Sequence, residues 1–471
     1  MRRGAQAIGF AAAVLVSQAG AQPVGHETSG PYEGFRVVAV ELDSVSDVRA
    51  MQAIGADQWS HRVREGEPTD FMVSPGQLAE LDRLGLPYAI TIEDVQGMID
   101  EERTRLRLGG GTRGWFDDFK DLDAINAQLD AFAASRPDIA ETFDVGLTLE
   151  GRTMRGLRIA NDSFGDGTCK PTILINACQH AREWIAPMVG MYAADRLLAE
   201  HGVDQTITDL VNRSEILLVP VANPDGYSYT WTNQRLWRKN RRNNGNGTIG
   251  VDLNRNWGVG WGLNNGSSGS GSSEIYRGTA PFSEPETQII KALAEAQPRL
   301  AAQVDLHSYG QLILAPWGYT GDLPPDHATF QQLGGEMQQI IRSVNGRTYT
   351  HGPCYTALYP ISGGEGDWFW GDRQAHNFLI ELRGNNFVLP PQEIIPNAEE
   401  VYPALVHFMS WARLERKPRA DFNDDAAMNT LDVLAFLNAW GAGDGSADFN
   451  DDGSVNTLDV LAFLNEWSAG C

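Results

Sequence analysis

Short apolar runs that alternate with helical stretches between residues 115 and 416 constrain the fold of this chain most strongly. Four of the runs have the length and composition of buried strands: residues 173–175, 215–221, 302–306 and 378–382. Helical spacing lies between them, as in residues 185–198, 285–296 and 327–344. The alternation predicts an α/β fold with a mixed, mostly parallel sheet and helices on both faces. In such sheets, active sites lie at the carboxyl ends of the strands.

His180 and Glu183 follow the first of these strands directly, within residues 176–184, which lead into a helix. Three residues apart in a helical turn, the two side chains project to the same side. An imidazole and a carboxylate placed together suit a divalent ion such as Zn²⁺. With nine histidines in the chain, one such pair is also expected by chance. The alternative is a capped helix start with an exposed ion pair.

Two further polar residues interrupt or end apolar strands. His307 lies 127 residues after His180, where the strand at 302–306 ends, and it is a candidate third ligand or a hydrogen-bonded histidine. Glu381 lies inside the strand at 378–382, where an uncompensated carboxylate is costly. Next to a zinc-activated water it would be a general base, and the alternative is a salt bridge to Arg383.

Two polar clusters, residues 233–242 and 252–257, complete the candidate site. The first is basic in a protein whose net charge is −24. In the second, Asn254 and Arg255 combine an amide with a guanidinium, which together grip a carboxylate. The alternative for both clusters is a solvated basic face.

Taken together, these motifs resemble the zinc carboxypeptidases of the pancreatic carboxypeptidase A/B type. The resemblance covers about residues 115–416. It rests on six motifs in the family's order and approximate spacing: residues 180–184, 235–239, 252–257, 306–309, 359–364 and 380–383.

The resemblance implies one catalytic zinc held by His180, Glu183 and His307, with Asp252 orienting His180. Glu381 would take a proton from the zinc-activated water and pass it to the leaving amine. The remaining implied roles are oxyanion stabilisation by Arg238, capture of the terminal carboxylate by Asn254, Arg255 and Tyr359, and subsite contacts by Arg182, Arg235, Ser308 and Tyr309.

This set implies removal of C-terminal residues from peptides and proteins. A buried clamp made of Asn254 and Arg255 is satisfied only by a free α-carboxylate. Gly366 would form the base of the side-chain pocket, and its expected apolar walls are Cys354, Ile361 and Leu379. We therefore expect a preference for apolar or aromatic C-terminal residues, while Glu365 leaves a basic preference open.

Two other functions are compatible with parts of the sequence. The same scaffold could serve an amidohydrolase for N-acyl amino acids or cell-wall peptides, against which the complete carboxylate clamp counts. The chain could also be a binding protein with an inactive peptidase, although every proposed catalytic side chain is present. No H-E-x-x-H motif occurs, so a metalloendopeptidase has no support.

The residues before the catalytic region predict a secreted precursor. Residues 1–21 have the basic start, apolar stretch and small-residue cleavage site of a secretory signal. Residues 22–113 read as a small α/β propeptide-like unit, or alternatively an accessory domain. Its end, residues 101–113, is basic and glycine-rich, and we expect it to be an exposed target for an activating protease.

The predicted location is extracellular, cell-surface-associated or periplasmic. No other stretch is long and apolar enough for a transmembrane helix, and a pI of about 4.7 argues against nucleic-acid binding.

The catalytic region is expected to end near residue 416, and residues 417–471 contain a repeat with a period of 27 residues. Each copy places acidic and amide oxygens at loop positions 1, 3, 5, 9 and 12, as Ca²⁺ requires. The expected ligands of two structural calcium ions are Asp421, Asn423, Asp425, Asn429 and Asp432 in the first loop and Asp448, Asn450, Asp452, Asn456 and Asp459 in the second.

An apolar helix follows each loop, and the unit resembles an all-α dockerin module. Gly453 supplies the sharp turn of the second loop, whereas Ala426 should strain the first and weaken its site. The resemblance implies a cohesin-like docking partner, with contacts near Thr430, Leu431, Thr457 and Leu458.

Four cysteines allow disulfides in such a compartment. Cys169 and Cys178 flank one strand and would lie roughly 30 Å apart if it is straight. We favour a bond between Cys178 and Cys354, with two buried thiols as the alternative. Cys471 is interpreted as an anchoring or processing residue, or a spare thiol.

Overall fold

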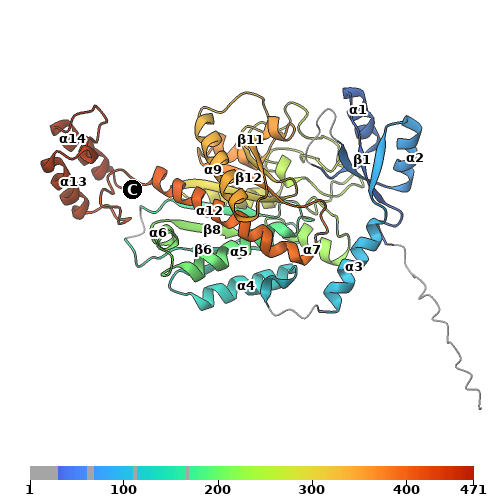
Figure 1. Ribbon diagram of the computed structural model, residues 1–471, viewed down its shortest axis with the longest axis horizontal. Coiled ribbons are helices and arrows are strands. Elements are labelled where there is room, and N and C mark those ends of the chain that lie inside the picture. The colour runs from blue at the N-terminus through green and yellow to red at the C-terminus, as the bar shows by residue number, and fades with distance from the viewer. Residues whose placement is uncertain (1–29, 61–67, 110–113, 166–168) are drawn as a thin grey trace, which may run out of the picture.

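The computed structural model describes residues 30–60, 68–109, 114–165 and 169–471 (Figure 1). The expected signal peptide and residues 110–113 of the expected cleavage segment lie outside the described residues. We refer to residues 30–109 as the N-terminal domain, to 114–416 as the central domain and to 417–471 as the C-terminal module. None of the described helices combines the length and the apolar character that a membrane crossing needs.

The N-terminal domain is a four-stranded antiparallel sheet with two helices on one face. Its elements are β1 (Arg36–Val40), α1 (Val45–Ile54), β2 (Asp57–Gln58), β3 (Thr69–Val73), α2 (Pro75–Leu84) and β4 (Tyr88–Ile92), and the strand order is β2-β3-β1-β4. Side chains alternate along β1. Val38 and Val40 pack against Met51 of α1 and Leu81 of α2, whereas Val37 belongs to a cluster shared with the central domain.

Helix α3 (Val95–Arg107) corrects one prediction. Residues 101–107 were expected to be an exposed cleavage segment, but they are helical, and Glu102 is 1% exposed. The helix forms because Asp94 caps its first turn and because Val95 and Ile99 bury an apolar stripe. Of the basic residues that suggested exposure, Arg105 pairs with the buried Asp118 at 3.2 Å, whereas Arg107 is exposed.

The central domain contains an eight-stranded mixed sheet, as predicted. Its strands are β5 (Ala140–Leu147), β6 (Thr153–Ile159), β7 (Thr172–Ala177), β8 (Glu215–Val219), β9 (Leu300–Ser308), β10 (Leu312–Ala315), β11 (Thr350–Pro353) and β12 (His376–Leu382). The order is β11-β10-β12-β9-β7-β8-β6-β5. Four neighbouring pairs are parallel and three are antiparallel. The four predicted strands, β7, β8, β9 and β12, include the sheet's fully buried centre.

Helices cover both faces of this sheet. Ile173 and Ile175 of β7 pack toward α5 (Ile185–Glu200) and α12 (Ile394–Arg416), whereas Leu174 packs toward α8 (Pro285–Glu295) and α11 (Glu365–Gly371). A strand that is apolar on both sides is therefore explained by two helical layers. The other helices of four or more residues here are α4 (Leu122–Ser135), α6 (Gln205–Arg213), α7 (Pro224–Thr232), α9 (His327–Asn345) and α10 (Cys354–Ala357).

The C-terminal module consists of two loops, each followed by a helix: α13 (Thr430–Ala442) and α14 (Thr457–Ala469). Asn429 and Asn456 begin the two helices with the same capping box. Phe436 and Phe463 occupy equivalent positions and stack with their ring centroids 4.2 Å apart. The sequence repeat is therefore also a structural repeat.

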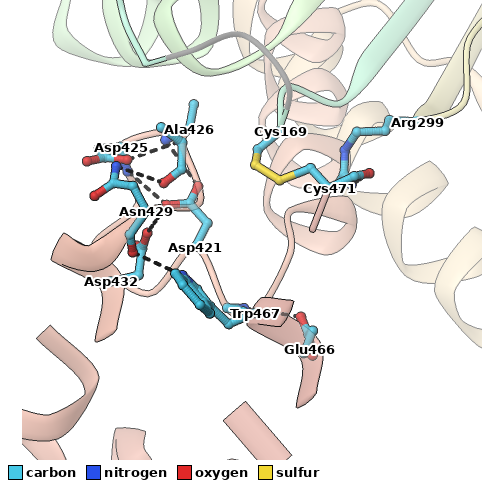
Figure 2. The surroundings of a disulfide bond; sticks show 12 residues. Cys169, Arg299, Asp421, Asp425, Ala426, Asn429, Asp432, Glu466, Trp467 and Cys471 are labelled. Atoms are coloured by element: carbon cyan, nitrogen blue, oxygen red, sulfur yellow. Dashed lines mark hydrogen bonds between the residues drawn. A yellow bond between two sulfur atoms is a disulfide. The ribbon is translucent and has the colours of Figure 1, made fainter. Parts of the chain in front are cut away.

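The favoured bond between Cys178 and Cys354 is not formed, and the alternative of two buried thiols is confirmed. Cys169 is bonded to Cys471, which lies 302 positions later in the sequence (Figure 2), and Cys178 and Cys354 are buried thiols. Cys178 turns its thiol toward the His180 carbonyl, whereas Cys354 packs in an apolar cluster beside β10. Cys471 is thus neither an anchor nor a spare thiol in this structure, because it links the C-terminal module to the central domain.

Ionic contacts reinforce this link. Asp424 of the first loop pairs with Arg213 of α6 at 3.3 Å and with Arg413 of α12 at 3.2 Å. Arg299 donates hydrogen bonds to the carbonyl oxygens of Cys471 and Arg416. The first loop therefore faces the central domain, as Figure 2 shows beside the disulfide.

Candidate active site

The segment between β7 and α5 places two of the predicted metal ligands. Helix α5 begins at Ile185, so His180 and Glu183 lie in a turn that precedes the helix rather than in its first turn. The Glu183 N–H donates to the His180 carbonyl at 3.2 Å and closes that turn. His180 Nδ1 and Glu183 Oε1 lie 2.8 Å apart, so the turn still brings both side chains to the same side.

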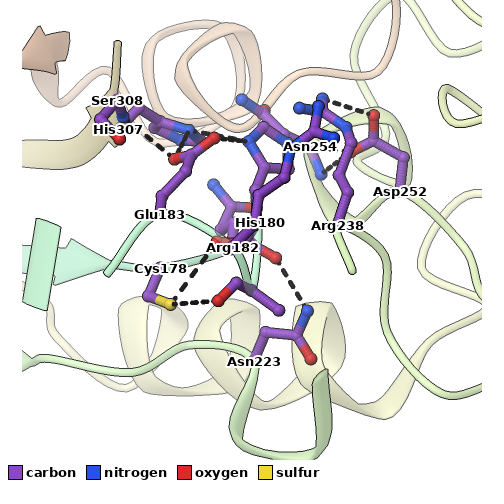
Figure 3. A network of polar contacts seen from close by, with 12 residues as sticks. Cys178, His180, Arg182, Glu183, Asn223, Arg238, Asp252, Asn254, His307 and Ser308 are labelled. Atoms are coloured by element: carbon purple, nitrogen blue, oxygen red, sulfur yellow. Dashed lines mark hydrogen bonds and ion pairs between the residues drawn. The ribbon is translucent and has the colours of Figure 1, made fainter. Parts of the chain in front are cut away.

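His307 completes this cluster from the end of β9 (Figure 3). Its Nδ1 lies 3.0 Å from His180 Nδ1 and 3.1 Å from Glu183 Oε2, and all three side chains are buried. One ligand atom from each residue lies within 4.8 Å of the others. Two imidazole nitrogens and a carboxylate oxygen that converge in this way form the donor set of a zinc site. Burial raises the pKa of Glu183, but the two histidines outweigh burial and lower it well below its usual value.

Asp252 holds the second ring nitrogen of His180, as predicted. Its Oδ1 lies 3.2 Å from His180 Nε2, and its Oδ2 accepts a hydrogen bond from Arg238 at 2.9 Å. Burial raises the pKa of Asp252, yet Arg238, Arg255 and His180 together lower it well below its usual value. The carboxylate is therefore ionised and can orient the imidazole.

Glu381 lies on β12 directly opposite His307 in the pairing of β9 with β12. Its side chain is buried, and burial raises its pKa to about 8, an effect that His307 and Arg238 partly oppose. A carboxyl group with a pKa near the working pH is suited to accept a proton and to return it.

The predicted carboxylate clamp is assembled from two segments. Arg255 lies in a short helical turn after Asp252, and its Nη1 donates to the Asn254 carbonyl at 2.7 Å. Its Nη2 lies 3.5 Å from the Tyr359 hydroxyl. Asn254 and Arg255 are buried, which increases the strength of a hydrogen bond to a bound carboxylate.

Arg182 and Arg235, the predicted subsite arginines, are covered by the N-terminal domain. Asp57 of β2 pairs with Arg182 at 2.5 Å, and Glu102 of α3 pairs with Arg235 at 2.6 Å. An apolar contact accompanies the two pairs, in which Trp59 packs against Phe387 with ring centroids 5.3 Å apart. Tyr309, which also packs against Phe387, is buried beneath the same cover.

Gly366 and the expected apolar wall line one small cavity. Cys354, Ile361 and Leu379 all contribute to it, together with Leu314 and Asn254. A side chain at Gly366 would bring a Cβ within 2.6 Å of Asn377 Oδ1, so glycine keeps this end open. Ser308 is buried beside the metal cluster, where its N–H donates to Glu183 Oε2 at 3.1 Å.

Sequence reasoning missed two groups of residues at this site. Asp57 and Glu102 lie in the N-terminal domain and gave no local signal. Asp305 is buried behind His307, together with Glu365, which sequence reasoning considered only for a basic preference. Asp305 lies in an apolar strand, so the argument applied to Glu381 could have found it.

The eight-stranded sheet, with two histidines and one carboxylate converging at its strand ends, suits a metal-dependent hydrolase. Comparison with known families agrees: the zinc carboxypeptidase family matches residues 125–404, and the carboxypeptidase activation peptide matches residues 35–102. The chain belongs to the zinc carboxypeptidase family and carries an activation peptide. It is therefore a metallocarboxypeptidase, which hydrolyses C-terminal peptide bonds and is made as a zymogen.

Known carboxypeptidases align with about four fifths of the chain. Carboxypeptidase A4 of Mus musculus is 35% identical over 398 residues, which cover 81% of this chain and 94% of that protein. Zinc carboxypeptidase A 1 of Anopheles gambiae is 34% identical over 393 residues, covering 80% and 89%. The crystal structure of carboxypeptidase A from Helicoverpa armigera superposes with a TM-score of 0.74 at 28% identity, covering 82% of this chain and 99% of that one.

Proposed function

We propose that His180, Glu183 and His307 hold the catalytic zinc and that Glu381 is the general base. The observation that carries this proposal is the convergence of two Nδ1 atoms and one carboxylate in a buried space beside Glu381. When bound, zinc would act as a Lewis acid for the scissile carbonyl and would lower the pKa of a water molecule. Glu381 accepts the proton of the attacking water and delivers it to the leaving amine, and Arg238 stabilises the oxyanion.

Substitution of the base tests this assignment. In the activated enzyme, Glu381→Gln should lower kcat by about 100- to 10,000-fold, because an amide cannot accept the proton. Zinc content should stay at one ion per chain, since the three ligands are unchanged. Normal turnover in this variant would remove Glu381 from the mechanism.

We infer that the free C-terminus of the substrate binds Asn254, Arg255 and Tyr359. An internal peptide bond brings no carboxylate to the buried guanidinium of Arg255, which explains the restriction to chain ends. Peptides that end in an amide should therefore resist hydrolysis, while matched peptides with a free carboxylate are cleaved. Equal rates on both would refute the clamp.

The preferred C-terminal residue is apolar in this proposal. The apolar side chains of Leu314, Cys354, Ile361 and Leu379 line the cavity at Gly366, together with the polar Asn254, Asp367 and Asn377. The carboxylate of Asp367 accepts hydrogen bonds from the N–H groups of Gly318 and Tyr319. Glu365 turns away from the cavity, because its carboxylate accepts hydrogen bonds from Asn176 and Gln179. A peptide series that differs only in its last residue should show the highest kcat/KM for apolar side chains. A basic optimum would overturn this preference.

Secretion and activation by a second protease complete the proposal for the catalytic part. The Cys169–Cys471 disulfide supports an oxidising compartment, which agrees with the signal sequence at residues 1–21. Cleavage after α3 would release the cover over Arg182 and Arg235. Recovery of the expressed chain from the cytoplasm only, with the disulfide reduced, would contradict secretion.

For the C-terminal module we propose two structural calcium ions. In the first loop, Asp421, Asp425 and Asp432 bring carboxylate oxygens within 4.8 Å of one another. Both loops fold back in the same way, since Asp421 and Asp448 each accept two N–H groups of their own loop. Ala426 has a φ of 63°, the strained conformation expected for this position. Titration of the metal-free protein with Ca²⁺ should show two sites, the first weaker.

The module is also proposed to dock to a cohesin-like partner. Leu431 and Leu458 support this, because they occupy equivalent positions and are 56% and 57% exposed. A partner of this kind should bind the full chain in calcium and release it in a chelator. Unchanged affinity for the partner in the double variant Leu431→Asp and Leu458→Asp would contradict the proposal.

A further inference from the structure

A buried cluster of amides and carboxylates lies behind His307, and the mechanism above does not use it. Asp305 precedes His307 by two residues on β9, and Glu365 opens α11. We call this group the Asp305–Glu365 cluster, and its members, all buried, are Asn176, Gln179, Gln303, Asp305 and Glu365.

Asp305 contacts the ring nitrogen of His307 that faces away from the other proposed ligands. Its Oδ2 lies 2.6 Å from His307 Nε2, whereas His307 Nδ1 faces His180 and Glu183. An imidazole that donates its Nε2–H to a carboxylate keeps a lone pair on Nδ1, which is the form that binds a metal. Asp305 therefore selects both the tautomer and the orientation of this ring.

The cluster fixes Asp305 in turn. Asn176 Nδ2 donates to Asp305 Oδ1 at 3.0 Å and to Glu365 Oε2 at 2.9 Å. Gln179 Nε2 donates to Asp305 Oδ2 at 2.5 Å and to Glu365 Oε2 at 2.7 Å. Two amides thus bridge the two carboxyl groups, and each oxygen of Asp305 has a partner.

Glu365 extends the same network to the substrate clamp. Its backbone N–H donates to Asn254 Oδ1 at 2.9 Å. Burial, and then the charge of Asp305, raise the pKa of Glu365 well above its usual value.

We propose that Asp305 is a positioning residue for metal binding, which holds His307 with Nδ1 toward His180 and Glu183, and that Glu365 braces Asp305 through the Asn176 and Gln179 amides. The inference rests on the proposed zinc ligands. It assigns Glu365 to the support of the metal site and not to the wall of the specificity pocket.

Zinc affinity of the full chain tests this inference without relying on turnover. Competition against a chromophoric chelator should show that Asp305→Ala weakens zinc binding about 10- to 100-fold, because the ring loses its orienting acceptor. Asp305→Asn should weaken it less, since the amide oxygen can still accept from Nε2–H. The matched control is Asp326→Ala, because Asp326 lies 2.7 Å from His376 Nε2 in a histidine–carboxylate pair that contacts none of the proposed ligands.

A spectrum separates positioning from general destabilisation. In the cobalt(II)-substituted protein, Asp305→Asn should shift the visible absorption bands, because the donor strength of His307 changes, while Asp326→Ala should leave them unchanged. If Asp305→Ala does not fold, Asp305→Asn and Gln179→Ala decide the question. Gln179→Ala removes one donor to Asp305 and should weaken zinc binding by several-fold.

Folded Asp305 variants with wild-type zinc affinity and wild-type cobalt spectra would overturn the inference. His307→Ala identifies a failure of a different kind: if that variant binds zinc as tightly as the wild type, the proposed ligand set itself is wrong. Loss of binding in His307→Ala with no effect in Asp305→Ala would reject only the role of Asp305.

Discussion

The N-terminal domain and the C-terminal module both attach to the central domain, but the first does so through non-covalent contacts and the second also through a disulfide. Figure 1 shows them at opposite ends of the molecule. The N-terminal domain is held by Asp57 and Glu102. These carboxylates form ion pairs with Arg182 and Arg235, the arginines proposed to bind substrate. The C-terminal module is held by the Cys169–Cys471 disulfide and by Asp424, none of which contacts the proposed catalytic residues.

This difference separates a removable cover from a permanent attachment. In the proposed mechanism Arg182 and Arg235 bind substrate, so a carboxylate that pairs with either of them would compete with substrate and would have to leave in the active enzyme. A covalent bond remote from the site is compatible with turnover. Four predictions test the contrast, in decreasing order of their expected effect on activity.

Release of the N-terminal domain should have the largest effect. Cleavage of the chain between residues 108 and 114 should raise the hydrolysis of a blocked dipeptide by at least about 100-fold, since two charge-assisted pairs and an apolar contact are lost. Activity before and after limited proteolysis measures this, with the C-terminal module retained. An uncut chain that is already fully active would show that the N-terminal domain is not a cover.

Weakening one pair should give a smaller gain. In the uncut chain, Glu102→Gln should raise activity about tenfold, because a neutral amide holds Arg235 less strongly than a carboxylate does. The neighbouring Glu101 is exposed, so Glu101→Gln is the matched control and should leave activity unchanged. Equal activity of the two variants would mean that the Arg235 pair does not restrain the cover.

Removing the disulfide should leave the chemistry intact. Cys471→Ser should change kcat/KM of the activated enzyme by less than about twofold, while the free energy of unfolding falls by about 2–5 kcal/mol. Cys169→Ser and the double variant should behave identically, because all three lack the same bond. Denaturant unfolding and steady-state kinetics on one preparation measure both quantities. A large loss of kcat would connect the module to catalysis.

The smallest effect is expected for Asp424. Asp424→Asn should lower stability by about 0.5–1 kcal/mol with no change in kcat/KM, because the pairs are partly exposed. Asp451 occupies the equivalent position in the second loop. Its ion pair is with the exposed Arg419 of the same module, so Asp451→Asn is the control. Equal shifts in the two variants would show that the first loop is not specially anchored.

The parts of the fold that follow from local chemistry could be predicted from the sequence. Residues 285–296 were expected to be helical and correspond to α8, which Pro285 begins. The polar residues at the strand ends, His307 and Glu381, were recognised because apolar strands rarely bury such groups. The strand-to-helix turn at His180 was placed correctly, and α5 begins at Ile185, the first residue of the expected helix.

Features that depend on distant segments could not be predicted. Cys169 and Cys471 meet only because the C-terminal module folds back on the central domain, and no local pattern records that path. The charges of residues 101–107 suggested exposure, but Glu102 is buried because Arg235 lies 133 positions later in the sequence and beside it in space. Strands β5 and β6 were missed because they lie at one edge, where apolar and polar residues mix.

The bond at Cys471 has one more consequence. The C-terminal module joins the central domain through the continuous chain at residue 417 and again through Cys169. A module joined by one flexible linker could take many orientations relative to the central domain, whereas two connections restrict it to fewer. If the module docks to a partner as proposed, the two connections would limit the orientations that the active site can take relative to that partner.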